Sequence, residues 1–283
     1  MTEYQTILIE KQDGITTLRF NRPEKRNAMN PRLHREMYDA LTELEFDPNT
    51  KVLVVTGQGE SFCAGQDLKE YFYELKDDAR GREEIRRISH AWRHEKLRFF
   101  PRPTIAAING WCFGGAFTVV CSVDVAIAAS EATFGLSEIN FGNIPGGLVT
   151  KVVQEVVQPR QALYYILTGD TFSGQKAADI GLVTMALPRA ELDAKVHEVA
   201  GKLLQKDPLA LRACKEAFKA VSPSVSYEDA WYWLAAKVDQ LSHQQKGANW
   251  VDQGIGQFIQ KNYKPGLGSA DFSKAESDNP MSS

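Results

Sequence analysis

The chain has 283 residues, of which 43% are hydrophobic, and its 33 basic and 36 acidic residues give a formal net charge of −3. This length and composition suit one large domain with a substantial core, or such a domain with a small appendage. The slight excess of acidic residues excludes the broadly basic surface of nucleic-acid-binding proteins, so we expect no nucleic-acid partner.

We expect neither a targeting segment nor a membrane span in this sequence. Its start, MTEYQTILIEK, lacks the basic and apolar regions of a secretory signal peptide, and no apolar run is long enough to span a membrane. The four cysteines, Cys63, Cys112, Cys121 and Cys214, form no CxxC pair, which favours a reducing compartment over a disulfide framework or a zinc site. We therefore expect a cytoplasmic protein with no membrane partner.

The chain is predicted to begin with a β-hairpin. Thr6–Glu10 and Ile15–Phe20 are rich in β-branched residues and flank a turn that contains Gly14. Asn30 and Pro31 then supply an N-cap and a first-turn proline for a helix with apolar residues at helical spacing.

The next segment is predicted to be a strand followed by helical and exposed parts. Val52–Thr56 is a short apolar run that suits a strand buried on both faces. Leu68–Leu75 suits a short helix, and the charged residues 76–84 suit an exposed loop. A further helix then places Ile85 and Trp92 on the core.

The alternation of strands and helices continues through the middle of the chain. Thr104–Ile108 is a predicted strand, residues 114–122 begin a helix, and Asp124–Ala129 is another strand. This pattern, which extends from Val52 to about Val183, indicates an α/β core.

From Arg189 onward the sequence predicts helices only. Their expected ranges are Ala190–Gln205, Leu209–Val221, Tyr227–His243 and Ala248–Lys261. The polar tail after them is expected to be disordered. We therefore divide the chain into an α/β core with the ligand site (residues 1–188), a helical region (189–263) and a tail (264–283).

Two glycine-containing links between a strand and a helix are candidates for ligand binding. They are Ser61–Leu68 and Asn109–Phe117, and the second fits no nucleotide-binding fingerprint. Taken alone, the first is more simply a tight turn, and the glycines of the second could simply permit close packing. Two such links in one sheet can nevertheless bring two free N–H groups together, which is the geometry of an oxyanion hole.

Glu138 is the candidate proton carrier. It lies in a mostly apolar and glycine-rich stretch, Thr133–Gly142, where a half-buried carboxylate would have a raised pKa suited to proton transfer. On composition alone, a solvated or helix-capping glutamate is the simpler interpretation.

Other candidates are weaker. His90 and His94 are four apart on a predicted helix but lack an acidic third ligand, so a polar helix face is favoured and no metal site is expected. Arg80–Arg87 mixes both charges and suits a solvated surface, whereas Lys25 follows a strand end and could grip phosphates or be plain surface.

Together, these segments resemble the crotonase (enoyl-CoA hydratase/isomerase) superfamily from about Ile7 to about Gly266. The motifs that carry the resemblance are Asn21-Arg22-Pro23 with Asn27-Ala28-Met29, Ala64-Gly65-x-Asp67-Leu68, and Asn109-Gly110-x3-Gly114-Gly115. The resemblance implies a spiral of ββα units with a helical C-terminal region, a homo-oligomer built as a trimer or a dimer of trimers, and an acyl-CoA substrate with no separate cofactor.

The resemblance also implies roles for individual residues. The N–H groups of Gln66 and Gly115 would form the oxyanion hole, Glu138 would move protons, and Thr118, which keeps a hydroxyl, would be a further catalytic residue. The expected CoA contacts, besides those two donors, are Lys25, Ala28, Ala64, Leu68, Phe258 and Lys261. The expected contacts to the acyl group are Tyr71, Ser137, Phe141 and Tyr232.

One departure from the family pattern bears on the reaction. Ordinary enoyl-CoA hydratases have a second glutamate three residues after the glycine pair, and this chain has Thr118 there. The closer resemblance is to hydroxycinnamoyl-CoA hydratase-lyases, in which a tyrosine matching Tyr71 binds the phenol. A second phenol-binding tyrosine is expected at Ala235, and Tyr232, one helical turn earlier, could replace it.

The implied reaction is hydration of a 4-hydroxycinnamoyl thioester followed by retro-aldol cleavage to an aromatic aldehyde, such as vanillin, and acetyl-CoA. Two alternatives stay open at this point. One is an enoyl-CoA hydratase or isomerase acting on another acyl-CoA. The other is a non-catalytic crotonase-like protein used for assembly or RNA binding.

Overall fold

The computed structural model describes residues 4–221, 224–245, 250–263 and 270. The chain divides into two compact units, the first formed by Met1–Phe100 with Thr104–Glu198 and the second by Pro101–Pro103 with Val199–Ser283. The predicted tail, 264–283, lies outside the described residues except for Ala270, and the predicted boundary at residue 188 stays a prediction.

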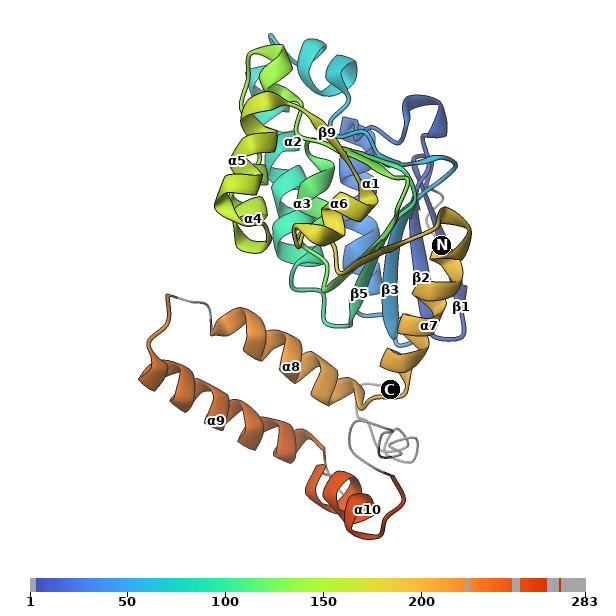
Figure 1. Cartoon of the computed structure of the whole chain (residues 1–283), viewed down its shortest axis with the longest axis vertical. Coiled ribbons are helices and arrows are strands. Elements are labelled where there is room, and N and C mark those ends of the chain that lie inside the picture. Colours follow the sequence, from blue (N-terminus) through green and yellow to red (C-terminus); the bar gives the residue numbers. More distant parts are fainter. Residues whose placement is uncertain (1–3, 222–223, 246–249, 264–269, 271–283) are drawn as a thin grey trace. The chain divides into compact units, whose positions relative to one another are not determined.

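A six-stranded sheet forms the centre of the first unit (Figure 1). Its strands, in spatial order, are β1 (Ile7–Gln12), β2 (Ile15–Phe20), β3 (Val52–Gly57), β5 (Thr104–Ile108), β7 (Val125–Ala129) and β10 (Met185–Leu187). The predicted hairpin is confirmed, since β1 and β2 are antiparallel with Gln12 opposite Ile15. The pairs from β2 to β10 are parallel, and β3 is buried along its whole length, as the sequence predicted.

A second, smaller sheet was not predicted. Its strands, in spatial order, are β4 (Ser61–Cys63), β6 (Trp111–Phe113), β8 (Thr133–Gly135) and β9 (Thr171–Ser173). Each of the first three follows a long strand of the large sheet. The pairs β4–β6 and β6–β8 are parallel, whereas β8 and β9 are antiparallel. The chain thus repeats a long strand, a short strand and a helical segment three times, which is the predicted ββα spiral.

The corners between the two sheets are tightly packed. A methyl group on Gly110, between β5 and β6, would lie 1.8 Å from the carbonyl oxygen of Glu60, between β3 and β4. The Asn109 amide crosses the same gap and donates to the carbonyl oxygens of Gly57 (3.0 Å) and Gly59 (2.8 Å). The corner of one turn therefore rests directly on the backbone of the previous turn.

Helices of the first unit complete its core. They are α1 (Pro31–Leu44), α2 (Ala79–His90), α3 (Ala116–Val120), α4 (Val149–Val156), α5 (Pro159–Thr168) and α6 (Gly174–Asp179), and α7 (Leu192–Leu204) begins in this unit. The predicted N-cap is confirmed, because the Asn30 side chain accepts from the Leu33 N–H at 2.9 Å. Figure 1 shows α1, α2 and α3 grouped on one side of the strands β1, β2, β3 and β5.

Two predictions for the segment around α2 are wrong. Residues 76–84 are not an exposed loop throughout, because α2 begins at Ala79 and the Asp78 side chain caps it by accepting from the Gly81 N–H at 2.8 Å. His94 is not on a polar helix face. It is buried in the π-helical segment Ala91–Leu97, beside Trp92, and burial lowers its pKa to about 4.

The described part of the second unit is helical, as predicted. After the end of α7 it contains α8 (Pro208–Ala220), α9 (Tyr227–Gln244), the π-helical segment Trp250–Ile255 and α10 (Gly256–Ile259). The Asp207 side chain caps α8 by accepting from the Ala210 N–H, and it also accepts from the Gln245 side chain at 3.0 Å. No helix in the described part of either unit is long and apolar enough to cross a membrane.

Candidate active site

Three candidate segments meet at one edge of the small sheet. Ala64–Gln66 follows β4, Gly114 and Gly115 follow β6, and Glu138 comes soon after β8. Because β4, β6 and β8 are parallel neighbours, their carboxyl ends lie at the same edge. The spiral therefore brings together residues that are about fifty and twenty positions apart in the sequence.

The first segment holds a free N–H group at Gln66. The Met29 N–H donates to the Gly65 carbonyl oxygen (2.7 Å), and the Asp67 N–H donates to the Met29 carbonyl oxygen (2.9 Å). In this parallel bridge the N–H of Gln66 itself points away from Met29. Among the described residues it has no hydrogen-bond partner, so it is available to a ligand.

Gly65 connects this segment to the second N–H group. Its φ of +89° is in the region that favours glycine, and a methyl group on it would lie 2.8 Å from the Phe113 carbonyl oxygen and 3.4 Å from the Gly115 nitrogen. The Gly115 N–H also lacks a partner in the described part of the chain. The structure thus places two unpaired donors, those of Gln66 and Gly115, on adjacent backbone segments, which is the arrangement an oxyanion hole needs.

Two of the family motifs, Asn21-Arg22-Pro23 and Asn27-Ala28-Met29, hold the segment Ala64–Gln66 in place. The Asn27 side chain accepts from the Arg22 N–H and donates to the Ser61 carbonyl oxygen (2.7 Å). The Arg22 guanidinium contacts the Asp67 carboxylate (3.0 Å) and the Glu70 carboxylate (2.6 Å). Motif residues that identified the family in the sequence therefore have a structural role at the donors.

Glu138 supplies a carboxyl group beside these donors. A methyl group on Gly114 would lie 3.0 Å from Glu138 Oε1, and Glu138 Oε2 is buried with no hydrogen-bond partner in the described residues. Burial is the main cause that raises the pKa of Glu138 above its usual value. This confirms the predicted half-buried carboxyl with a raised pKa.

The Gln66 side chain is held by buried His34, which the sequence did not predict as part of the site, and His34 is held in turn by the core residue Trp92. Trp92 Nε1–H donates to His34 Nδ1 at 2.9 Å, so the neutral ring carries its proton on Nε2 and donates it to Gln66 Oε1 at 2.8 Å. Burial, with help from the Arg93 charge, lowers the pKa of His34 to about 3 and keeps the ring neutral. His34 could have been suspected from its place among the apolar positions of α1.

Thr118 is fully buried under the second donor. Its hydroxyl donates to the Gly115 carbonyl oxygen at 2.7 Å and accepts from Arg93 Nη1 at 2.8 Å. The hydroxyl hydrogen is thus engaged within the protein, which favours support of the Gly115 segment over direct contact with a substrate. The predicted catalytic contribution of Thr118 stays a prediction.

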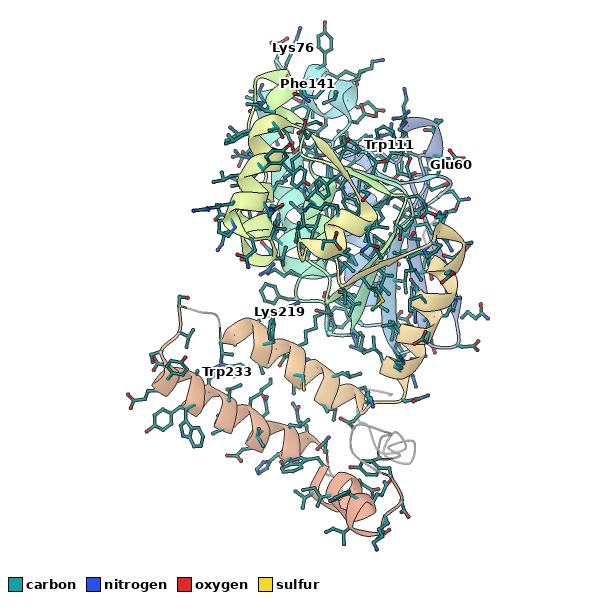
Figure 2. All side chains as sticks on the ribbon, in the orientation of Figure 1. Glu60, Lys76, Trp111, Phe141, Lys219 and Trp233 are labelled. Carbon is teal, nitrogen blue, oxygen red and sulfur yellow. The ribbon has the colours of Figure 1, made fainter. Side chains whose placement is uncertain are left out.

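The residues of the first unit that are predicted to contact the acyl group, Tyr71, Ser137 and Phe141, differ in location and exposure. Tyr71 is half-buried in the π-helical segment Leu68–Tyr73, and its ring centroid is 5.4 Å from that of His34. Ser137 immediately precedes Glu138. Phe141 is 67% exposed and projects at the upper end of the unit in Figure 2. Tyr71 is thus linked to the Gln66 donor through His34.

The predicted CoA contacts in the first unit are close in space. The Ala64 N–H donates to the Arg26 carbonyl oxygen at 2.9 Å and the Ala28 N–H to the Lys25 carbonyl oxygen at 3.0 Å, so the two segments run side by side. Lys25 and Leu68 are exposed beside them. This location suits contact with a ligand that enters from solvent.

Three predicted site residues and the alternative position Ala235 belong to the second unit. Tyr232 and Ala235 lie on α9, Phe258 on α10 and Lys261 just beyond it, and all four are exposed. Their roles in the site stay predictions. Over the residues described in both units, no group of three metal-ligating side chains lies together.

Comparison with known proteins gives consistent matches. Residues 10–263 match the family model of enoyl-CoA hydratase/isomerase. The hydroxycinnamoyl-CoA hydratase-lyase of Pseudomonas fluorescens is 49% identical over 93% of this chain and 96% of its own. The crotonyl-CoA hydratase of Syntrophomonas wolfei is 34% identical over 76% of this chain and 81% of its own. Among solved structures, an enoyl-CoA hydratase from Bacillus anthracis has a TM-score of 0.81 and 28% identity, covering 91% of this chain and 97% of its own.

Proposed function

Since the chain belongs to the enoyl-CoA hydratase/isomerase family, we propose that it is a hydratase-lyase that cleaves 4-hydroxycinnamoyl-CoA thioesters to an aromatic aldehyde and acetyl-CoA. Its fold is the crotonase fold that the sequence predicted. The observation that carries the proposal is the meeting of two unpaired N–H donors with the half-buried carboxyl of Glu138 at one sheet edge. The 49% identity to a protein of that activity supports it.

The first stage is addition of water to the enoyl double bond. Glu138 in its carboxylate form takes a proton from water, whose oxygen bonds to Cβ of the thioester. The electron pair moves onto the thioester oxygen, and the N–H groups of Gln66 and Gly115 stabilise the enolate. Return of the proton from Glu138 to Cα gives the β-hydroxy thioester and restores the carboxylate.

The second stage is cleavage at the same site. The carboxylate takes the proton of the β-hydroxyl, the carbonyl of the aldehyde forms at Cβ, and the Cα–Cβ bond breaks toward the thioester. The electron pair again reaches the oxygen held by the two donors, and protonation at Cα gives acetyl-CoA. Both stages thus need one proton carrier and one oxyanion hole, which matches a site that has Thr118 in place of a second glutamate.

Tyr71 would bind the hydroxylated ring of the hydroxycinnamoyl group. A 4-hydroxyl on the ring assists addition of water, because its electrons can flow toward a quinone-methide-like form. Tyr71 lies next to His34 and thus close to the Gln66 donor, so a ring held there would project past the thioester. Ser137 and Phe141 are proposed to line the acyl group from the Glu138 side.

The remaining contacts are proposed to come from CoA binding and assembly. Lys25, Ala28, Ala64 and Leu68 would contact CoA, which is part of the substrate, and no separate cofactor is proposed. The exposed residues Tyr232, Phe258 and Lys261 would complete the site within a trimer or a dimer of trimers. A homo-oligomer of this kind would also cover apolar side chains of α9, such as Trp231, which is 70% exposed.

The direct test is incubation of the purified protein with feruloyl-CoA and, in parallel, crotonyl-CoA. We expect vanillin and acetyl-CoA to form in equal amounts from feruloyl-CoA, measured by chromatography. Hydration of crotonyl-CoA without aldehyde release from feruloyl-CoA would contradict the proposal and favour a plain hydratase. Absence of binding to either thioester would favour a non-catalytic protein of the same fold.

A further inference from the structure

Arg93 is a cation buried directly behind the Gly115 donor. Arg93 comes directly after Trp92 in the π-helical segment Ala91–Leu97, and only 3% of the residue is exposed. Nη1 donates to Thr118 Oγ1 at 2.8 Å and to the Gly115 carbonyl oxygen at 3.3 Å. Nε donates to the Ser89 carbonyl oxygen at 2.9 Å, and Nη2 donates to the Ser89 hydroxyl.

All four of these acceptors are neutral oxygens. Among the residues that the structure describes, no carboxylate lies within ion-pair distance of the Arg93 guanidinium. A buried charge without a counter-ion is costly, and buried charges in proteins are ordinarily paired. Burial lowers the pKa of Arg93 to about 10, while the phenol of Tyr71 and the thiol of Cys63 act in the opposite direction. Arg93 is therefore still charged at neutral pH.

The position of this charge relates it to the reaction. A methyl group on Gly115 would lie 3.5 Å from Arg93 Nη1, with Met29 Cε (3.2 Å) and Gln66 Cγ (3.5 Å) as its other close neighbours. The guanidinium thus lies buried beside the Gly115 segment of the oxyanion hole. In a buried environment, a fixed positive charge this close to Gly115 favours negative charge on a thioester oxygen bound in the oxyanion hole.

We propose that Arg93 is a positioning residue and fixed counter-charge for the enolate: it fixes the Gly115 segment through Thr118, and it has no counter-ion among the described residues until the thioester oxygen becomes negative. The inference rests on the proposed function for the existence of an enolate, but not on the identity of the acyl group. It also explains Thr118, whose hydroxyl joins Arg93 to the Gly115 carbonyl. A glutamate at position 118 would instead pair with Arg93 and neutralise its charge.

The effect on the chemistry is specific. An empty site contains an unpaired cation, and a neutral thioester only partly relieves this cost. The enolate adds a negative charge near Arg93, so the interaction is stronger in the transition state than in the ground state and should raise kcat more than it lowers KM. A role in folding alone would instead lower the free energy of unfolding and leave both kcat per folded molecule and KM nearly unchanged.

The test uses Arg93→Met and Arg93→Lys in the full chain. We expect Arg93→Met to lower kcat roughly 10- to 100-fold with less than about a threefold change in KM, and Arg93→Lys to recover much of this loss because it keeps the charge. Arg87→Met on α2 is the matched control, because Arg87 is exposed and pairs with Glu83. If Arg93→Met does not fold, Arg93→Gln replaces it, since its amide can still donate to Gly115 without a charge.

A spectroscopic measurement separates this inference from the proposed function. Cinnamoyl-CoA, which lacks the 4-hydroxyl, is bound to Glu138→Gln protein, where polarisation of the thioester carbonyl by positive charge should shift its absorption to longer wavelength. We expect a smaller shift when Arg93→Met is added, and no change from Arg87→Met. An equal shift in Glu138→Gln with and without Arg93→Met, or equal kcat in Arg93→Met and wild-type protein, would overturn the inference. Absence of aldehyde from feruloyl-CoA would contradict only the proposed function.

Discussion

The two donors of the oxyanion hole are supported in different ways. The Gln66 donor lies on a segment paired with Met29, and its side chain accepts from His34, a neutral ring that is itself fixed by Trp92. The Gly115 donor is backed by a charged group, Arg93, through Thr118 and the Gly115 carbonyl. The difference is one of net charge: the ion pairs that hold the first donor's segment, between Arg22 and Asp67 and Glu70, contain their own counter-ions, whereas the cation behind the second donor has none among the described residues.

Removal of the Glu138 carboxyl should lower turnover more than any other change. Both N–H donors stabilise the same enolate, but neither can move a proton. We expect Glu138→Gln to lower turnover of feruloyl-CoA by ~10²–10⁴-fold with CoA binding retained. Steady-state kinetics and calorimetric titration with CoA measure the two quantities. Turnover within a few-fold of the wild type would show that another group carries the proton.

Tyr71→Phe should lower activity only on substrates that carry a ring hydroxyl. Tyr71 lies next to His34, on the side of the Gln66 donor. Loss of the phenol leaves a 4-hydroxyl without its partner, which costs about 1–3 kcal/mol, whereas crotonyl-CoA does not extend to this position. The measurement is kcat/KM for feruloyl-CoA and crotonyl-CoA in both proteins. Equal losses on the two thioesters would mean that Tyr71 supports His34 or the fold.

A parallel test on Tyr232 addresses the position where the second phenol-binding tyrosine is expected. If Tyr232 serves in place of Ala235, Tyr232→Phe should show the same selectivity as Tyr71→Phe. Equal kcat/KM values for Tyr232→Phe and the wild type on feruloyl-CoA would remove Tyr232 from the site.

His34→Leu should sharpen the contrast with Arg93. It leaves Trp92 Nε1–H and Gln66 Oε1 without partners, so we expect a loss of about 2 kcal/mol or more in the free energy of unfolding, measured with denaturant. Gln66→Met is the milder control, since it leaves only one His34 N–H unpaired. We expect His34→Leu to keep the absorption shift of bound cinnamoyl-CoA that Arg93→Met reduces. Loss of the shift in His34→Leu would mean that the two donors do not differ as described.

The pH dependence of activity should reflect the titration of Glu138, and not that of His34 or Arg93, the two side chains that support the donors. The pKa of His34 is about 3 and that of Arg93 about 10, so both supports keep their charge state across the range between these values. Burial raises the pKa of Glu138, and the carboxylate is the active form in water addition, so activity should fall as the pH drops through a value above that of an ordinary glutamate. The acid limb of kcat/KM measures it. A limb at or below the usual glutamate value would contradict this assignment.

The long elements of the first unit were predictable because each has its own local pattern. The hairpin has its turn, α1 has Asn30 and Pro31, and β3 is an apolar run buried on both faces. The small sheet was not predictable from the sequence pattern, because a three-residue strand such as β4 is too short to show a period of two. Its existence depends on contacts with strands from other turns of the spiral.

The site was predictable in part for a similar reason. Glycines and the lone glutamate mark the reacting positions, and the family motifs assign them roles. Arg93 and His34 carry no such mark, because each lies among apolar positions of a helix and its partner is distant in the sequence. A charged or polar residue on the buried face of a helix is the only local sign of either.

The tight corner at Gly110 has a consequence for how this scaffold could change its specificity. A side chain there would collide with the Glu60 carbonyl oxygen, so position 110 must remain glycine while the two corners stay in contact. The two donors follow β4 and β6, the short strands that leave these corners, so a larger residue in the corner would be expected to disturb both donors together. Diversification toward other acyl groups is therefore confined to side chains that project from the turns, such as Tyr71 and Phe141, while the reacting centre is inherited unchanged.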